Sequence, residues 1–154
     1  MDSASRETPT LQLQLFGAPE IRVAGVTYPG LAAKTQALLF YLGMTRRPHL
    51  RTALAALLWA DMPERDARGN LRKAIQQLQE QFSDYLAVDH HSVGLRADAP
   101  CWVDAVEFLS VAGDAGPGGA ASNCLRAVQL YGGEFLAGFY VRNAPEFEAW
   151  MLAE

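Results

Sequence analysis

RGNLRKAIQQLQEQF, residues 68–82, is the stretch that decides the fold. A helix advances by about 100° per residue, so a helix over residues 64–82 gathers its apolar side chains on one arc. That arc holds Ala67, Leu71, Ala74, Ile75, Leu78 and Phe82. The opposite arc is basic at its start and rich in amides in its middle, with Arg65, Gly69, Arg72, Lys73, Gln76, Gln77 and Glu80. The pattern predicts an amphipathic helix with one side in a hydrophobic core.

The exposed arc of this helix has two interpretations. Arginine and lysine donate hydrogen bonds to guanine, and glutamine can pair with adenine, so Arg72, Lys73 and Gln76 suit base reading in the major groove of DNA. Gly69 would let the helix backbone approach a ligand closely. The same residue types are also favoured on the solvated side of any helix, and Glu80 would repel phosphate. From this helix alone both interpretations stay open.

The segments before the helix predict a small sheet and two shorter helices. LQLQLF (residues 11–16) and EIRV (20–23) alternate apolar and polar residues, as half-buried strands do, and VTY (26–28) is a third short candidate. Helical spacing of apolar residues then covers residues 33–44 and 51–59. We expect an N-terminal antiparallel sheet that follows a disordered lead of about ten residues.

The segment after the helix predicts a β-hairpin. LAVD (86–89) and VGL (93–95) flank a polar tip, HHS (90–92). Three helices closed by a hairpin form the element order of a winged helix-turn-helix, whose third helix enters the major groove of DNA. The sequence therefore predicts an α+β fold with a winged helix DNA-binding domain over residues 11–96.

Basic and hydroxyl residues at the starts of these helices are candidate phosphate contacts. A histidine at the hairpin tip could reach the DNA backbone or minor groove. Together with the exposed arc, the candidate DNA-binding residues are Lys34, Arg51, Thr52, Arg65, Arg68, Arg72, Lys73, Gln76, Gln77 and His91. Arg46 and Arg47, after the first helix, are further basic neighbours. Each of these residues could also be an ordinary surface side chain.

The remainder of the chain predicts a second unit made of helices. Residues 97–103 resemble a linker, and residues 103–112 form a candidate helix with Asp104 at its N-cap. A loop over residues 113–119 and a helix over residues 120–131 follow, and Pro145 suits the first turn of a last helix.

The distribution of charge supports two units with different roles. Residues 1–98 carry 11 basic and 10 acidic side chains, whereas residues 99–154 carry 2 basic and 7 acidic side chains. We expect residues 103–154 to form the beginning of a helical domain. The net charge of the whole chain, −4, argues mildly against a nucleic-acid partner.

The composition narrows the class of protein. Half of the 154 residues are hydrophobic, so the chain can bury a core, and 19% charged residues are too few for a disordered protein. The longest apolar run, residues 53–60, is too short to span a bilayer, and the N-terminus lacks the apolar segment of a signal peptide. We expect a cytoplasmic protein. Cys101 and Cys124 make neither a metal motif nor a disulfide framework, and we interpret both as small buried hydrophobes.

Enzyme motifs are missing from the sequence. It contains no GxxxxGK[ST], HExxH or GxSxG pattern. Carboxylates at 61, 64 and 66 beside a helix start are typical of dipole partners, and Asp89, His90 and His91 lack a further ligand at metal spacing. We therefore expect no catalysis, cofactor or metal. Trp59, Trp102 and Trp150 are spaced too widely for a base-stacking platform, which favours a packing role.

Several stretches carry a resemblance to a known family. LAAKTQALLFYLGM (31–44), RTALAALLWADMPERDARGNLRKAIQQLQEQF (51–82), LYGGEFLAGF (130–139) and EFEAWMLAE (146–154) resemble the antibiotic-regulatory-protein family of bacterial activators. The resemblance covers residues 11–154. It implies an OmpR-like winged helix followed by the start of a bacterial transcriptional activator domain, built from all-α, tetratricopeptide-like hairpins. It also implies that the chain is the N-terminal part of a longer regulator in the bacterial cytoplasm, associated with the nucleoid.

The same resemblance implies roles and partners. Lys34, Arg51 and Thr52 fall where the family contacts phosphate, and residues on the third helix, including Arg65, Arg68, Arg72, Lys73 and Gln76, fall on its recognition helix. Double-stranded DNA, RNA polymerase and a second copy of the chain on paired half-sites are the implied partners, and no membrane is involved.

Two function classes remain after this comparison. The first is a sequence-specific DNA-binding activator. The alternative is a protein-interaction module whose winged helix no longer binds DNA, which the acidic net charge together with Gln77 and Glu80 would suit. A titration with duplex DNA at low salt discriminates between them.

Overall fold

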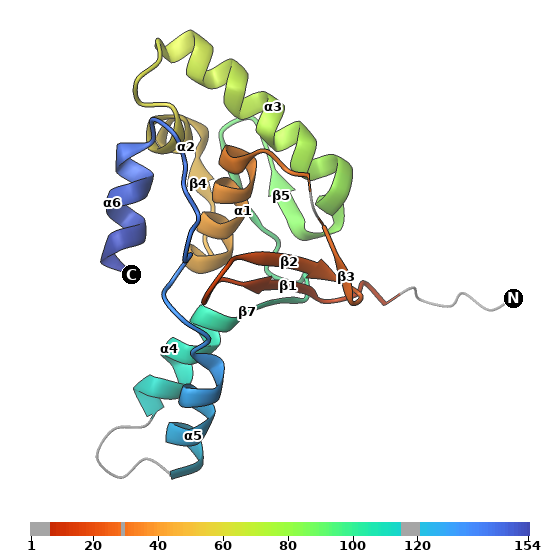
Figure 1. The fold of residues 1–154 in the computed structure, drawn as a ribbon. Helices are drawn as coiled ribbons and strands as arrows, with labels where there is room; N and C mark the ends of the chain where they lie inside the picture. The colour runs from red at the N-terminus through yellow and green to blue at the C-terminus, as the bar shows by residue number, and fades with distance from the viewer. Residues whose placement is uncertain (1–6, 29, 115–120) are drawn as a thin grey trace, which may run out of the picture.

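The computed structural model describes residues 7–28, 30–114 and 121–154. Figure 1 shows the chain, whose first part has the elements β1 (Leu11–Gln14), β2 (Glu20–Val23), β3 (Val26–Thr27), α1 (Ala33–Thr45), β4 (His49–Leu50), α2 (Arg51–Leu58), α3 (Glu64–Phe82), β5 (Leu86–Val88) and β6 (Ser92–Leu95). A single 3-10 turn, Ser83–Tyr85, joins α3 to β5. The later elements are β7 (Cys101–Val103), α4 (Asp104–Asp114), α5 (Ala121–Leu130) and α6 (Pro145–Ala153). Most of the expected N-terminal lead and of the loop over 113–119 lies outside the described residues.

The N-terminal sheet has four strands in the order β3-β2-β1-β7. β1 pairs antiparallel with β2, as expected, but β7 joins the other edge of β1 in parallel, with Leu11 opposite Cys101 and Leu13 opposite Val103. The expectation of a linker over residues 97–103 is therefore wrong for residues 101–103, and the sheet is mixed rather than purely antiparallel. The strand forms because the free edge of β1 offers backbone hydrogen bonds that a returning chain can satisfy.

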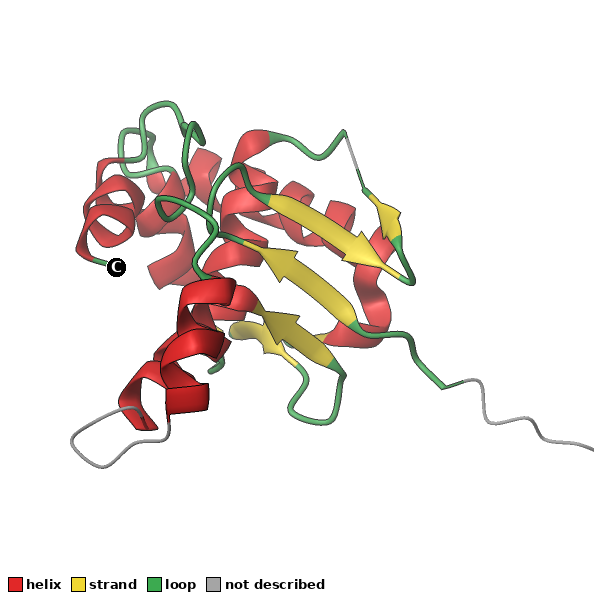
Figure 2. Ribbon diagram, turned by 60° about the horizontal axis from the view of Figure 1, so that its bottom comes forward, coloured by secondary structure: helices red, strands yellow, loops and turns green. Residues whose placement is uncertain are grey.

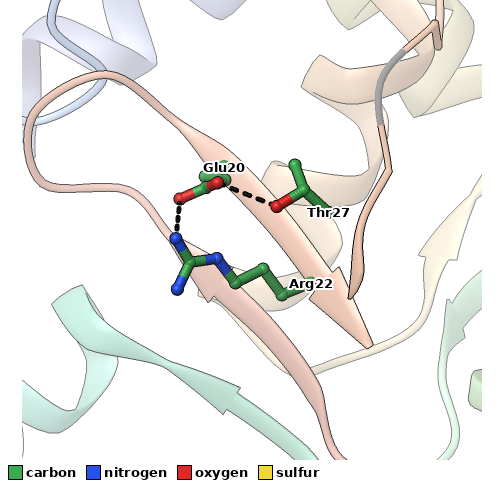
Figure 3. Close-up of polar contacts among 3 residues, drawn as sticks. All are labelled: Glu20, Arg22 and Thr27. Atoms are coloured by element: carbon green, nitrogen blue, oxygen red, sulfur yellow. Dashed lines mark hydrogen bonds and ion pairs between the residues drawn. The ribbon is translucent and has the colours of Figure 1, made fainter. Parts of the chain in front are cut away.

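The two faces of this sheet differ as the alternating sequence predicts. Leucines of β1 and apolar residues of β2 are buried against the helices, which lie behind the strands in Figure 2. On the outer face, Glu20 pairs with Arg22 at 2.7 Å and accepts a hydrogen bond from Thr27 at 3.0 Å (Figure 3). These partners lower the pKa of Glu20. Exposed pairs of this kind contribute little stability, so the network is an ordinary sheet surface.

The three central helices and the second sheet form a winged helix-turn-helix. α1, α2 and α3 pack on one another. The second sheet has the strand order β4-β6-β5, so the hairpin of β5 and β6, which is the wing, lies beside the short strand that precedes α2. Wing and helix are joined directly, because the backbone N–H of Arg51 donates to the carbonyl of His91 at 2.8 Å. The predicted order of a sheet, three helices and a hairpin is confirmed, but the two-residue strand β4 between α1 and α2 was not predicted.

The helix α3 has the bounds and the orientation that its sequence predicts. It runs from Glu64 to Phe82, and its buried side chains are the six of the predicted apolar arc: Ala67, Leu71, Ala74, Ile75, Leu78 and Phe82. In Figure 1 it lies along the outer edge of the molecule, at the end opposite the α4–α5 hairpin. The residues of its polar arc are exposed except for Gly69 and Gln77, which are half-buried.

The C-terminal helices return to the winged helix. α4 and α5 form a hairpin that projects from the sheet, and α6 packs beside α2. Between α5 and α6 the backbone runs beside the end of β1, where Leu136 N–H donates to Leu15 O at 2.7 Å and Gly17 N–H donates to Glu134 O at 2.8 Å. A Cβ on Gly133, whose φ is +139°, would meet the Gly17 backbone at 3.3 Å. The positive φ and this close approach explain a glycine at position 133.

Two single-residue expectations need correction. Asp104 is the first residue of α4, and besides the N–H of Ala105 its carboxylate accepts hydrogen bonds from the N–H groups of Leu15 and Phe16, beyond the end of β1. Asp104 therefore connects the end of β1 to the start of α4 through its side chain. Cys101 is half-buried, and burial raises the pKa of its thiol, but Cys124 is exposed on α5, so the prediction that it is buried is wrong.

Within the residues that the structure describes, no helix is both long enough and apolar enough to cross a membrane.

Candidate nucleic-acid interface

The exposed ridge of α3 carries the central part of the predicted site. Arg65, Arg72, Lys73 and Gln76 are exposed, and Gln77 is half-buried at the side of the helix. Arg65, Arg72 and Lys73 make no ion pair with any residue of the described ranges. Three cations on one helix surface, without internal partners, are available to an anionic ligand.

A hollow lies on the side of α3 that faces α2 and the wing. Its volume is ≈ 380 Å³, and it is lined by Leu50, Arg51, Thr52, Arg68, Leu71, Arg72, His90 and His91. Five of these are predicted site residues from three separate elements. The fold therefore brings the start of α2, the first half of α3 and the tip of the wing to one place.

Arg51 is the best fixed of these side chains. Its Nε donates to the backbone carbonyl of Asp89 at 2.9 Å, so the guanidinium bridges from α2 to the wing. Arg68, in contrast, is paired with Glu64 one turn earlier on α3, at 2.7 Å, with both side chains exposed. An exposed pair of this kind is weak and exchanges readily for another anion.

The tip of the wing is ordered by Asp89. Its carboxylate accepts hydrogen bonds from the N–H groups of His91 and Ser92, both at 2.7 Å, and from the Ser92 hydroxyl at 3.1 Å. These donors lower the pKa of Asp89, because they stabilise its ionised form. The hydrogen bonds of this carboxylate all lie within the turn. Both histidines are exposed at the tip of the wing.

A second hollow lies on the other side of α3, between it and the start of α1. Its volume is ≈ 680 Å³, and its lining includes Lys34, Trp59, Lys73, Gln76, Gln77 and Glu80. The ammonium group of Lys34 lies 5.3 Å from the centre of the Trp59 ring, a cation–π contact. Burial lowers the pKa of Lys34, and the charge of Asp61 opposes that shift.

The two hollows together collect nine of the ten predicted residues, on either side of the α3 ridge. The tenth, Arg65, is exposed in the first turn of α3. Arg46 does not join them, since its guanidinium donates to the carbonyl of Cys101 at 2.8 Å and so braces the sheet.

Besides the buried Thr35, sequence reasoning missed two polar residues of the α1 side. Asn70 and Arg142 line the same hollow as Lys73 and Gln77. Asn70 lies on the helix wheel between the two arcs, which hid it. Arg142 lies far along the chain, between α5 and α6, and only its basic charge in an acidic segment could have drawn attention to it.

Most charged side chains that line the two hollows are cationic, which suits an anionic ligand. Among the described residues, no group of three histidine, cysteine, aspartate or glutamate side chains could hold a metal ion. Of the two carboxylates in the first turn of α3, Glu64 pairs with Arg68. What remains is a ridge of cations and amides flanked by two polar hollows.

No protein-family model matches the chain, and no curated protein matches it. Its fold is similar to that of EmbR from Mycobacterium tuberculosis, solved in complex with a low-affinity phosphopeptide. The TM-score is 0.71 at 22% sequence identity, over 93% of this chain. The chain spans 41% of the length of that structure. At this level of identity the likeness establishes the mixed α and β winged-helix fold alone.

Proposed function

We propose that this chain is the DNA-binding part of a bacterial transcriptional activator of the antibiotic-regulatory-protein family. The observation that carries the proposal is the position of α3. It presents an unpaired basic and amide-rich ridge at the edge of the molecule, between two hollows that hold nearly all the other candidate residues. The sequence resemblance to that family and the likeness of the fold to EmbR support the same function.

The dimensions of DNA explain why a ridge between two hollows suits a duplex. A major groove is about 12 Å wide and an α-helix with its side chains is about 10–12 Å across, so a helix fills the groove. The ridge then faces the base edges, and the residues on either side face the two phosphate backbones. This gives each group of residues a distinct role.

In this docking, the ridge residues Arg72, Gln76 and Lys73 read base edges, with Arg65 near the entry of the groove. On one side Arg51, Thr52 and Arg68 bind phosphates, and His91 at the tip of the wing contacts the flanking DNA backbone. On the other side Lys34 and Gln77 face the second backbone. Glu80, in the same hollow, repels phosphate and so limits how far along α3 the duplex extends.

We propose two functional units, a winged helix over residues 11–96 and the start of a helical activator domain over residues 103–154. The helical unit exposes apolar side chains on one hairpin: Leu109 at 57%, Leu125 at 65% and Val128 at 72% of their full accessible area. Exposed apolar residues of this kind favour a protein partner. RNA polymerase is the partner that the activator role requires, and a second copy of the chain on a paired half-site is a further one.

The test of the proposal is sequence preference, because phosphate contacts alone carry none. Duplexes enriched by the protein from a random pool supply a preferred sequence, and binding to it is compared with binding to a scrambled duplex. Arg72→Ala removes a base contact, and we expect it to lower the discrimination by about 1–3 kcal/mol. Arg22→Ala, which removes an arginine from the outer face of the sheet, is the matched control.

Equal loss of discrimination in both variants, or none in either, contradicts base reading by α3. Failure of the pool to enrich any sequence while the protein still binds duplex points to non-specific binding. Absence of binding at low salt favours the alternative, a protein-interaction module.

A further inference from the structure

We propose that Arg142, from the segment between α5 and α6, is a phosphate contact in the DNA interface on the α1 side of α3. The inference rests on the proposed function and extends it, since it makes the helical unit part of the surface that meets DNA. It follows from three properties of this arginine: its place, its support and its charge.

The place of Arg142 is the hollow between α1 and α3. It lines that hollow with Lys34, Lys73 and Gln77, although it lies 65 or more positions beyond all three in the sequence. When α3 occupies a major groove, this side faces one of the two backbones. A guanidinium there matches the geometry of phosphate oxygens through paired N–H donors.

The support of Arg142 is a tight turn fixed at both ends. Val141 and Ala144 are buried, at 6% and 3% exposure, and Asn143 between them has a left-handed φ of +55°. Further back, the ring of Phe139 packs on Phe40 of α1 with centroids 5.3 Å apart. The turn therefore presents an exposed Arg142 from a backbone that is held against the winged helix, which lowers the entropic cost of using it.

The charge of Arg142 stands out in its part of the chain. Residues 99–154 contain only two basic side chains, and the other, Arg126, is paired with Glu107 at 2.6 Å on the α4–α5 hairpin. Arg142 makes no ion pair with any described residue. In the hollow it joins two lysines against one carboxylate, Glu80, so the hollow is net positive within a chain whose net charge is negative.

The consequence is a link between DNA binding and the helical unit. Arg142 precedes α6, whose first residue is Pro145 and which packs beside α2. A duplex that holds Arg142 also holds this turn in place. The orientation of α6 relative to α3 is then fixed more firmly on DNA than off it.

The experiment uses the whole chain and a fluorescent duplex, with affinity measured at several salt concentrations. A phosphate contact contributes about −0.9 to the slope of log affinity against log salt. We expect Arg142→Ala to make the slope less steep by about that amount and to weaken binding several-fold at low salt. Arg142→Lys should retain most of the slope. Arg126→Ala is the matched control, because it removes the same charge from the α4–α5 hairpin.

The outcomes separate this inference from the proposed function. If the unmodified chain binds with a steep salt dependence, but Arg142→Ala and Arg126→Ala give the same slope as it does, the inference is overturned and DNA binding stands. If the unmodified chain does not bind duplex even at low salt, the proposed function is overturned and the inference falls with it. Circular dichroism of each variant establishes that it is folded. Arg142→Glu reverses the charge and should weaken duplex binding further than Arg142→Ala does.

Discussion

Asp104 connects the two parts of the chain through one carboxylate. The side chain is 4% exposed and accepts hydrogen bonds from the N–H groups of Leu15 at 2.8 Å, Phe16 at 3.0 Å and Ala105 at 2.8 Å. The first two donors lie just beyond β1 and the third is in α4. Without the carboxylate these buried donors would have no partner, and an unsatisfied buried donor is costly.

Replacement of Asp104 by alanine is expected to lower the free energy of unfolding by about 2–3 kcal/mol. Urea denaturation followed by circular dichroism measures the loss. Asp98→Ala is the control, because that carboxylate is exposed and only pairs with Arg96. An equal and small effect of both substitutions would mean that the connection through Asp104 contributes nothing to stability.

The sequence predicted some single residues correctly and others not. Asp104 was predicted at the start of a helix, but its bonds to residues 15 and 16 depend on a partner almost 90 positions away, which local pattern does not encode. Cys124 was predicted to be buried from the usual preference of free cysteine, yet α5 has no buried residue among those described. Burial of a helix depends on what packs against it, and that is a property of the fold.

At the scale of elements, α3 was predicted from end to end because its amphipathic pattern repeats over five turns. β7 was missed for the opposite reason. It has three residues, Cys101–Val103, and its partner β1 is about 90 positions earlier in the chain. Three residues give no measurable period, and Pro100 before them suggested a linker. Pairing between short strands that are far apart in the chain leaves no local pattern in the sequence, so it could not be predicted.

A substitution at Gly69 on α3 should have opposite effects on protein stability and on DNA binding. A Cβ at this position meets no atom within 4 Å, so Gly69→Ala should be tolerated and should raise stability by up to about 1 kcal/mol through helix propensity. The same methyl group stands on the surface proposed to enter the major groove. We expect weaker duplex binding despite the higher unfolding midpoint, measured by anisotropy and thermal denaturation.

A matched substitution tests the reason for this result. Gln79→Ala changes an exposed residue of α3 that has no role in the proposed interface, so it should alter binding less. Unchanged affinity in Gly69→Ala would indicate that the helix backbone does not approach the DNA.

At the scale of the whole molecule, aromatic contacts hold the C-terminal segment on the winged helix. Trp150 of α6 packs edge-on against Tyr41 of α1, with centroids 4.9 Å apart, and against Phe135 at 5.9 Å. The ring of Phe147, which is 1% exposed, packs against the ring of Trp150 with centroids 5.4 Å apart. The sequence predicted a packing role for Trp150, but not which side chains it would contact.

Phe147→Ala is expected to destabilise the entire chain rather than release α6 alone. Loss of a fully buried phenylalanine costs about 3–5 kcal/mol. Because α6 and β7 both pack on the winged helix, unfolding monitored by tryptophan fluorescence and by circular dichroism should coincide in one transition. Two separated transitions would mean that the units fold independently. Leu152→Ala, at an exposed position of the same helix, should have little effect.

The shape of the candidate interface could be predicted only in part. The sequence supplied the ridge of α3 and the basic residues near it, but not their division into two sides, which depends on where α1 and the wing lie. It did not supply Arg142, because no local pattern joins that residue to the start of α1.

The measurement that tests the account most directly is the affinity of the whole chain for duplex DNA as a function of salt. Fluorescence anisotropy should give log affinity that falls linearly with log salt, with a slope of about −3.6 if Lys34, Arg51, Arg68 and Arg142 each meet a phosphate. Absence of binding at low salt, or binding that does not weaken as salt rises, would contradict the claim that α3 and its flanks form a DNA interface.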